Sequence, residues 1–380
     1  MSWQSVLEKT ADNENAYECM QTCLAQSTPI YVGSNIVENV LIEQLDKLRP
    51  DRVFIITDDA VGSIYGGGIA TSLGAYYEVH TLTFPEGETN KTIFTLSKLG
   101  NELFMRRVSK NSVIVALGGG IVGNVAGLLA ALVFRGITFI EVPTTFLAQT
   151  DSIMSSKQAV NTVFGKNMLG VYYPPYCNIV DVRFLLTESA RSIRSGLVET
   201  VKNGLINDAT LFKYMRKKIP ELSLNRLEEL ELLVKLSILS KIDIIKTDPS
   251  EKKRGMILEY GHTAGHAIEK LMNGALTHGE CVSIGMVAAA KISEALGFLT
   301  NTHVKLHEEV LTALGMPVTL PAGMQPQDVL DTIEHDNKRE ADGIKYVILE
   351  NIGRVKVDNG KYMIPVPYEV VKSVLNSMVP

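Results

Sequence analysis

The chain has 380 residues, of which 46% are hydrophobic and 21% are charged, and its formal net charge is −5. This length predicts two domains with ample core, and the composition is ordinary for a globular enzyme. The acidic balance gives no reason to expect a nucleic-acid partner. Four cysteines are too few for a disulfide scaffold, so we expect a reducing, cytoplasmic setting and interpret Cys19 and Cys23 as one face of a helix.

Nothing in the sequence favours a membrane segment. The N-terminal residues lack an apolar stretch after a basic start, which argues against a signal peptide. Residues 111–134 carry no charge and are long enough to span a bilayer, but they contain five glycines preceded by a β-branched run. A strand, a glycine turn and a helix explain this stretch better than one spanning helix.

Short apolar runs recur in the first half of the chain and alternate with helical patterns. The runs RVFIIT, YEVHTLTF, SVIVAL and ITFIEV predict strands over residues 52–57, 77–84, 112–117 and 137–142. This alternation predicts a mostly parallel sheet covered by helices. Ligands of such sheets bind at the carboxyl ends of the strands, and here those ends are polar or glycine-rich.

Beyond about residue 178 helical periodicity dominates, and it continues to about residue 303. We therefore expect an α/β domain over residues 1–178 and a mostly helical domain over residues 179–380.

A glycine-rich turn follows the third predicted strand. Gly118, Gly120 and Gly123 form a G-x-G-x-x-G pattern that ends a strand and opens a helix, which is the context of a dinucleotide-binding turn. Glycines let a pyrophosphate approach the backbone, and the N-terminus of a helix favours its charge. The pattern alone also fits a tight turn that binds nothing. Glu141 lies at the offset of the acidic residue in such folds, but it equally fits a strand end.

Three of the seven histidines lie between residues 262 and 278. His262 and His266 fall on one face of a predicted helix between Glu259 and Glu269, and His278 follows in a loop. Imidazole and carboxylate groups suit zinc or cobalt. They also serve as acid/base pairs without a metal, or as a polar patch near a core.

A further carboxylate is available in GLVETVKNG, where Glu199 and Lys202 lie on one helix face. It could complete a metal site with the histidines.

A basic group lies in DSIMSSKQAVNTVFGKN. Asp151, Lys157, Lys166 and Asn167 combine cations with an amide, which suits a phosphate. A solvated basic loop is an equally good interpretation of this stretch alone.

Together and in this order, the clusters resemble the sugar-phosphate cyclase family, whose best-known member is 3-dehydroquinate synthase. The matching stretches are GGGIVGNVAG, FRGI, VPTTFLAQTDS, KQAVN, GKNMLG, SGLVETVKNG and GHTAGHAIE with HGE, and the resemblance runs from about residue 28 to the C-terminus. It implies an N-terminal NAD-binding α/β domain, a helical C-terminal domain, one divalent metal ion (zinc or cobalt) and a homodimer.

The resemblance also implies roles for particular residues. The metal ligands would be Glu199, His262 and His278, which leaves His266 on the phosphate side of the site. The residues that contact the cofactor would be Asp58, Glu88, Lys91, Gly118, Gly119, Gly120, Asn124, Thr144, Thr145, Asp151 and Lys166. The residues that act on the substrate would be Lys157, Asn167, Lys202, Lys241 and His266, with Arg135 (from across the dimer) and Lys338 at its phosphate. Apart from the resemblance, we expect Glu259 to act on the substrate by hydrogen-bonding a sugar hydroxyl.

The chain departs from the dehydroquinate synthase pattern where that enzyme grips a substrate carboxylate. Those enzymes carry an arginine seven residues before the first metal histidine, where this chain has Gly255, and an asparagine where it has Glu259. Arg254 is adjacent but would point elsewhere on a helix, and Asn124 replaces the usual aspartate after the glycine loop. A substrate without a carboxylate needs no arginine, and an unpaired buried arginine would be costly.

At these positions the sequence resembles the branch of the family that converts the sugar phosphate D-glucose 6-phosphate to 2-deoxy-scyllo-inosose. That product leads to 2-deoxystreptamine aminoglycosides. The implied reaction is redox-neutral. C4 is oxidised by NAD+ while the metal polarises its oxygen, phosphate leaves from C6, C4 is reduced again, and the C6 enol attacks the C1 aldehyde.

Other interpretations stay open. Within the family they are 3-dehydroquinate synthase itself and a valiolone-type cyclase of sedoheptulose 7-phosphate. Outside it they are an NAD- and metal-dependent polyol dehydrogenase, which would accumulate NADH, and an inactive homologue that stabilises a partner.

Overall fold

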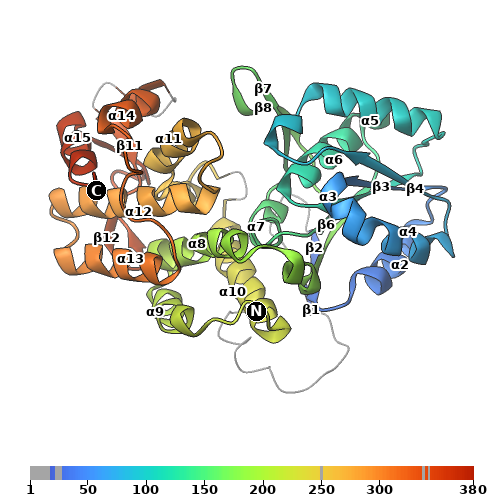
Figure 1. Ribbon diagram of the computed structural model, residues 1–380, viewed down its shortest axis with the longest axis horizontal. Coiled ribbons are helices and arrows are strands. Elements are labelled where there is room, and N and C mark those ends of the chain that lie inside the picture. The colour runs from blue at the N-terminus through green and yellow to red at the C-terminus, as the bar shows by residue number, and fades with distance from the viewer. Residues whose placement is uncertain (1–17, 22–27, 249–250, 336–338, 341–342) are drawn as a thin grey trace. The chain divides into compact units, whose positions relative to one another are not determined.

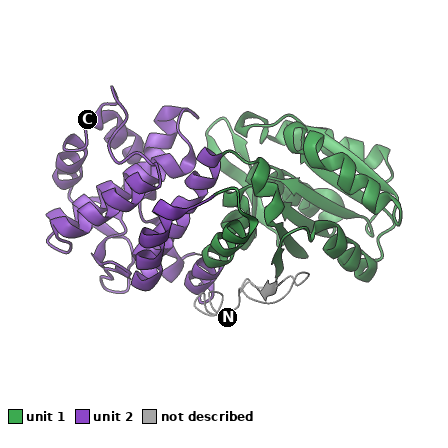
Figure 2. Cartoon of the chain, turned by 60° about the horizontal axis from the view of Figure 1, so that its bottom comes forward, with its two compact units in different colours: residues 1–189, 224–238 green, residues 190–223, 239–380 purple. Residues whose placement is uncertain are grey.

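The structure is a computed structural model that describes residues 18–21, 28–248, 251–335, 339–340 and 343–380. The chain divides into two compact units, drawn in two colours in Figure 2. Unit 1 comprises residues 1–189 and 224–238, and unit 2 comprises residues 190–223 and 239–380.

Unit 1 is built on a seven-stranded sheet with the order β1-β2-β9-β6-β5-β3-β4. Only β1 runs antiparallel to its neighbour; the other strands are parallel. The strands are β1 (Glu18–Gln21), β2 (Pro29–Gly33), β3 (Val53–Asp58), β4 (Val79–Phe84), β5 (Val113–Gly118), β6 (Phe139–Pro143) and β9 (Cys177–Asp181). The four predicted strands are thus confirmed as β3 to β6. The helix interpretation of Cys19 is wrong, because pairing with β2 holds that residue in an edge strand, and Cys23 lies outside the described residues.

Helices cover both faces of this sheet (Figure 1). Phe54 and Ile56 of β3 pack on one face with α5 (Ile93–Met105) and α6 (Gly120–Leu132). On the other face Ile55 packs with α2 (Val37–Leu48) and α4 (Gly67–Gly74). Burial on both faces explains why the strands read as continuous apolar runs rather than as alternating patterns.

Residues 111–134 form β5, the glycine turn and α6, as predicted. Apolar packing on the sheet accounts for the missing charges, since most of α6 is buried. Within the described parts of the chain, no helix is long and apolar enough to cross a membrane.

The order of the strands creates a ligand-binding position in unit 1. The connection after β3 leads to β4 on one side, whereas the connection after β5 leads to β6 on the other side. The carboxyl ends of β3 and β5 therefore flank a topological switch point, where open α/β sheets bind ligands.

Shorter elements complete unit 1. They include α3 (Asp59–Val61), η1 (Gly62–Gly66), η2 (Glu88–Asn90), η3 (Val133–Arg135), α7 (Phe146–Thr150), η4 (Ser152–Met154) and η5 (Val182–Thr187), with the hairpin of β7 (Lys157–Thr162) and β8 (Gly165–Tyr172).

Unit 2 is mostly helical, as predicted. Its helices are α8 (Ala190–Asn207), α9 (Ala209–Lys218), η6 (Ile219–Glu221), the end of α10 (Leu227–Ile245), η7 (Arg254–Glu259), α11 (His262–Met272), α12 (His278–Ala295), α13 (Asn301–Ala313), α14 (Pro326–His335) and α15 (Tyr368–Asn376). The helices α8, α11, α13 and α15 pack on α12, which is buried along most of its length because most of its residues are apolar or small. Unit 2 also contains two small sheets that were not predicted. One is formed by β10 (Arg339–Glu340), β11 (Gly343–Tyr346) and β14 (Ile364–Val366), and the other by β12 (Leu349–Asn351) and β13 (Arg354–Val355).

Candidate active site

Two of the clustered histidines open neighbouring helices of unit 2. His262 is the first residue of α11 and His278 is the first residue of α12. Gly261 precedes His262 with a φ of +80°, and a Cβ atom there would lie 2.5 Å from the Met286 side chain. A Cβ atom on Gly285 would lie 1.9 Å from the Gly261 carbonyl oxygen. Bare backbone at both glycines therefore lets α11 pack closely on α12 and brings the two histidines together.

The carboxylate of Glu199, on α8, lies between these two rings. Its Oε1 atom is 3.7 Å from His262 Nε2 and 3.7 Å from His278 Nε2. One ligand atom from each residue fits within a 4.8 Å span. The same Oε1 atom is buried without a hydrogen-bond partner among the described residues. A buried carboxylate oxygen facing two imidazole nitrogens is a donor set for a divalent ion such as zinc or cobalt, so these residues fit the implied metal.

The surroundings of Glu199 and His262 determine their protonation states. Burial alone would raise the pKa of Glu199, but the Lys202 ammonium and the two histidines outweigh it and hold that pKa well below its usual range. Lys202 is buried and forms an ion pair with Glu199 one turn away on α8. Burial and the Lys202 charge lower the pKa of His262 well below its usual range. Glu199 is therefore ionised and His262 is neutral, which are the forms that bind a metal.

His278 lies between two carboxylates. Its Nδ1 atom is 3.1 Å from Glu269 Oε2, while its Nε2 atom faces Glu199. Burial lowers the pKa of His278, but its interactions with the carboxylates of Glu199 and Glu269 raise it to about 10. A metal ion at this position would therefore have to displace a proton.

His266 belongs to a different part of the cluster. Its ring centroid lies 4.9 Å from that of His262 and 6.0 Å from that of His278. It groups with Glu269 and His278 rather than with Glu199. The helical spacing alone left open whether His262 and His266 would bind the metal as a pair, and only His262 faces Glu199.

Two of the remaining predicted residues of unit 2, Lys241 and Glu259, lie in described elements. Lys241 is buried near the end of α10, and Glu259 is half-buried at the end of η7. Lys338 lies outside the described residues.

Arg254 does not offer a free guanidinium at the position next to Gly255. Its Nη2 donates to Asn207 Oδ1 at 2.6 Å, and its Nη1 donates to the Asp243 carbonyl at 2.9 Å. The Gly255 amide donates to Asp248 Oδ2 at 2.9 Å. A Cβ atom at Gly255 would lie 3.1 Å from that same oxygen, so the loop is tightly packed around the glycine.

The glycine turn of unit 1 leaves little or no room for a side chain at Gly118 and Gly119. Gly118 ends β5, and a Cβ atom there would lie 2.4 Å from Val122. Gly119 caps α6, Gly120 opens it, and a Cβ atom on Gly119 would lie 3.2 Å from Thr145. The Thr144 amide donates to the Gly118 carbonyl at 2.9 Å and so joins the loops after β5 and β6. The backbone amides that begin a helix lack partners within it, so the start of α6 fits the pyrophosphate of a dinucleotide.

Other predicted cofactor residues surround this turn. Asp58 ends β3, next to β5 in the sheet, and burial raises its pKa. Asn124 lies in the second turn of α6, half-buried. Asp151 follows α7, which Thr145 caps by accepting from the Ala148 amide.

Glu141 does not reach the edge of the sheet. A Cβ atom on Gly123 would lie 2.2 Å from Glu141 Oε1, so the carboxyl group lies beneath α6. Burial raises the pKa of Glu141 to about 7. Its resemblance in spacing to an acidic residue that contacts the cofactor is therefore misleading.

A hydrogen-bond network joins η2 to the β7–β8 hairpin. Lys91 donates to Asn167 Oδ1, and the Asn167 amide donates to Asn161 Oδ1 at 2.8 Å. Asn161 Nδ2 donates to Glu88 Oε1 at 2.7 Å. The structure thus brings Glu88, Lys91 and Asn167 together through Asn161, which was not predicted. The short spacing of KQAVN and GKN across a turn is the signal that could have indicated it.

Three predicted cations of unit 1 lie on exposed positions. Lys157 begins β7 and Lys166 lies near the start of β8. Arg135 has a φ of +67° and follows Phe134 at +51°. Two successive residues other than glycine in the left-handed region are strained, and such strain concentrates at functional sites.

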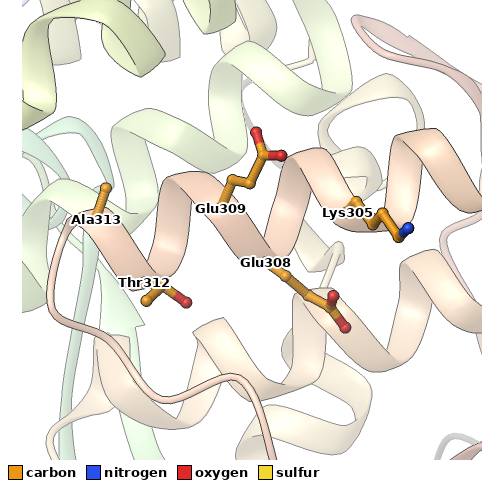
Figure 3. A pocket seen from close by; sticks show the side chains of 5 residues that line it. All are labelled: Lys305, Glu308, Glu309, Thr312 and Ala313. Atoms are coloured by element: carbon orange, nitrogen blue, oxygen red, sulfur yellow. The ribbon is translucent and has the colours of Figure 1, made fainter.

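A shallow hollow on the outside of unit 2 holds none of the predicted residues. It is lined by Lys305, Glu308, Glu309, Thr312 and Ala313, which Figure 3 shows along α13. Its charges of both signs and its distance in sequence from the histidine cluster give no reason to assign it a substrate.

The fold and the two residue groups define a class of protein. Residues 81–195 match the family model of the 3-dehydroquinate synthase N-terminal domain, and residues 196–339 match that of its C-terminal domain. The chain belongs to the 3-dehydroquinate synthase family.

The similar proteins include members of two branches of this family. The chain is 36% identical over 356 residues to a 2-deoxy-scyllo-inosose synthase from Streptoalloteichus tenebrarius, covering 92% of each chain. A 3-dehydroquinate synthase from Desulforamulus reducens is 35% identical over 334 residues, covering 87% of this chain and 93% of that one. A solved structure of 2-deoxy-scyllo-inosose synthase, complexed with carbaglucose-6-phosphate, NAD+ and Co2+, matches with a TM-score of 0.88 at 34% identity, covering 95% of this chain and all of that one.

Proposed function

We propose that the protein is a lyase that converts D-glucose 6-phosphate to 2-deoxy-scyllo-inosose and phosphate. The observation that carries this proposal is the loop at Gly255. A dehydroquinate synthase needs a cation there to bind a carboxylate, but this loop has no side chain at that position and Arg254 is already bound to Asn207 and Asp243. Two relatives that are 2-deoxy-scyllo-inosose synthases, at 36% and 37% identity, support the same substrate.

Glu199, His262 and His278 would hold one Co2+ or Zn2+ ion, because their oxygen and two nitrogens converge. When bound, such an ion polarises the C4 oxygen of the sugar and stabilises charge that develops there. Lys202 keeps Glu199 ionised, and we assign to its ammonium group a role in proton transfer at the C4 oxygen.

Unit 1 would hold NAD at the switch point of its sheet. The α6 N-terminus and the glycine turn suit the pyrophosphate, and the other contacts would come from Asp58, Glu88, Lys91, Asn124, Thr144, Thr145, Asp151 and Lys166. Bound NAD+ accepts a hydride from C4 and later returns it, so the overall reaction is redox-neutral.

The residues of the chain would then control the sugar and its phosphate. Lys157, Asn167, His266 and Arg135 would bind the phosphate, with Lys338 as a further cation. Once C4 is a ketone, an oxygen of the phosphate group takes the proton from C5, the C5–C6 double bond forms, and phosphate leaves from C6. After C4 is reduced again and the ring opens, the C6 enol attacks the C1 aldehyde, with both carbons held in one molecule. Lys241 would bind the substrate, and Glu259 would accept a hydrogen bond from a sugar hydroxyl.

We also propose a homodimer in the cytoplasm. The β7–β8 hairpin exposes Val163 and Phe164 at 95% and 89%, and Met168 and Tyr172 at 66% each. Exposed apolar groups gathered on one hairpin are typical of an interface. The strained backbone of Arg135 supports a role for its guanidinium across such a dimer. The product would enter aminoglycoside biosynthesis.

A second candidate is 3-dehydroquinate synthase, because the relative from Desulforamulus reducens is almost as similar. Release of inorganic phosphate, measured with NAD+ and Co2+ or Zn2+, separates the two. Glucose 6-phosphate, the heptulosonate phosphate of the shikimate pathway and sedoheptulose 7-phosphate should be offered in parallel. We expect release from glucose 6-phosphate alone; release only from the heptulosonate phosphate would refute the proposal.

A further inference from the structure

The two histidines at the proposed metal position are oriented through their outer nitrogens. His262 Nδ1 lies 3.1 Å from the Tyr260 carbonyl oxygen, and His278 Nδ1 lies 3.1 Å from Glu269 Oε2. In each ring the opposite nitrogen, Nε2, lies 3.7 Å from Glu199 Oε1. Both rings thus present the same nitrogen to one point.

The two outer partners differ in kind. A backbone carbonyl can only accept, so His262 Nδ1 carries the hydrogen and the Nε2 lone pair of the neutral ring is free. The partner of His262 is the backbone carbonyl of Tyr260, so a side-chain substitution cannot remove it. The partner of His278 is a carboxylate, whose charge makes the hydrogen bond roughly twice as strong as a neutral one.

The sequence places this carboxylate by helical spacing. His262, His266 and Glu269 recur at i, i+4 and i+7 and therefore share one face of α11. That face meets the start of α12, where His278 stands. The His278 and Glu269 side chains are 27% and 20% exposed, so water screens their interaction only in part.

We propose that Glu269 is a positioning residue that fixes the ring of His278, with its Nδ1 protonated and its Nε2 directed at the metal position. This inference rests on the proposed metal site and assigns Glu269 a role in metal affinity rather than in contact with the substrate. It also assigns Glu269 away from a second metal site with His266, because its carboxylate is engaged by His278 Nδ1. Carboxylate partners of this kind orient the ring and raise its basicity as a ligand.

The test measures binding of Zn2+ by competition with a chromophoric chelator, without substrate. Glu269→Ala should weaken binding by about 10-fold to 100-fold, the usual effect of losing such a partner. Glu269→Gln keeps an oxygen acceptor without the charge, so its affinity should fall between those of Glu269→Ala and the unchanged protein. Lys270→Gln, at the neighbouring exposed position of α11, is the matched control and should bind like the unchanged protein.

A spectroscopic measurement separates positioning from general loss of structure. In the Co2+-loaded protein, the Nδ1 protons of both ligand histidines should give paramagnetically shifted resonances that disappear in D2O. Glu269→Ala should shift or broaden the His278 resonance and leave that of His262 unchanged. Unaltered affinity and unaltered resonances in both Glu269 variants would overturn the proposal, as would an equal loss in Lys270→Gln. These measurements need no turnover, so an unchanged protein that binds metal but does not convert glucose 6-phosphate would refute the proposed function alone.

Discussion

Burial would by itself favour a neutral carboxyl group at Glu199, yet Lys202 and two imidazoles surround it and keep it ionised. The group is thus held as an anion with one oxygen that no described hydrogen-bond donor satisfies. A buried, unsatisfied carboxylate oxygen is costly unless a ligand completes it. The arrangement at residue scale is therefore one that a divalent cation would stabilise.

His307 is another buried histidine of unit 2. The Tyr260 hydroxyl is 3.0 Å from His307 Nε2, and His307 Nδ1 is 2.8 Å from the His303 carbonyl. The carbonyl can only accept, so Nδ1 carries the hydrogen and Nε2 accepts from the hydroxyl. Burial lowers the pKa of His307 to about 4, so the ring is neutral in the folded protein.

We predict that His307 contributes to acid unfolding. Its folded pKa lies below the unfolded value of about 6.5, so the unfolded chain binds more protons between those values. The stability that neutral His307 contributes should therefore be complete above about pH 6.5. As the pH drops towards 4, the free energy of unfolding should fall by at most about 1.4 kcal/mol per pH unit because of this group. The free energy of unfolding should be measured by urea unfolding at several pH values, for the unchanged protein and for His307→Gln, both without metal. It should depend less steeply on pH in the variant. Equal slopes would contradict the assignment.

The elements most visible in the sequence are those buried on both faces. Continuous runs such as VFIIT and VIVAL predict strands because both neighbouring layers are apolar, and the glycine turn is visible because only bare backbone fits there. The strands of the β7–β8 hairpin are not apparent in the sequence, because the second strand is exposed along its length and lacks a buried face that would set an alternating pattern. The strands of unit 2 have two to four residues and are too short to leave a periodic signal. The orienting contact of Glu269 depends on ring geometry that spacing alone does not specify.

The hairpin carries a prediction about assembly. Replacing both Val163 and Phe164 with glutamate should weaken the proposed homodimer, since it places charge in apolar contacts. Folding should be unaffected, because both side chains are almost fully exposed. Sedimentation velocity of the purified protein over a range of concentrations is the measurement, with Tyr76→Glu, 66% exposed near α4, as the control. An unchanged protein that is monomeric throughout, or a variant that dimerises equally well, would contradict the prediction.

At the scale of the whole molecule, each unit would supply one of the two proposed cofactor sites. Unit 1 offers a dinucleotide position at the switch point of its sheet, and unit 2 offers three converging metal ligands. A dehydrogenase also combines such sites, so their presence does not by itself distinguish net oxidation from a redox-neutral cyclisation. What separates the two reactions is the fate of the hydride removed from C4.

The most direct test of the central claim follows that hydride. Glucose 6-phosphate carrying deuterium at C4 should be converted by the NAD+- and Co2+-loaded protein while absorbance at 340 nm and the product are monitored. Transient oxidation predicts 2-deoxy-scyllo-inosose that retains deuterium at the carbon derived from C4, one phosphate per product, and no accumulation of NADH. Accumulation of deuterated NADH in proportion to product would contradict the account and identify a dehydrogenase instead.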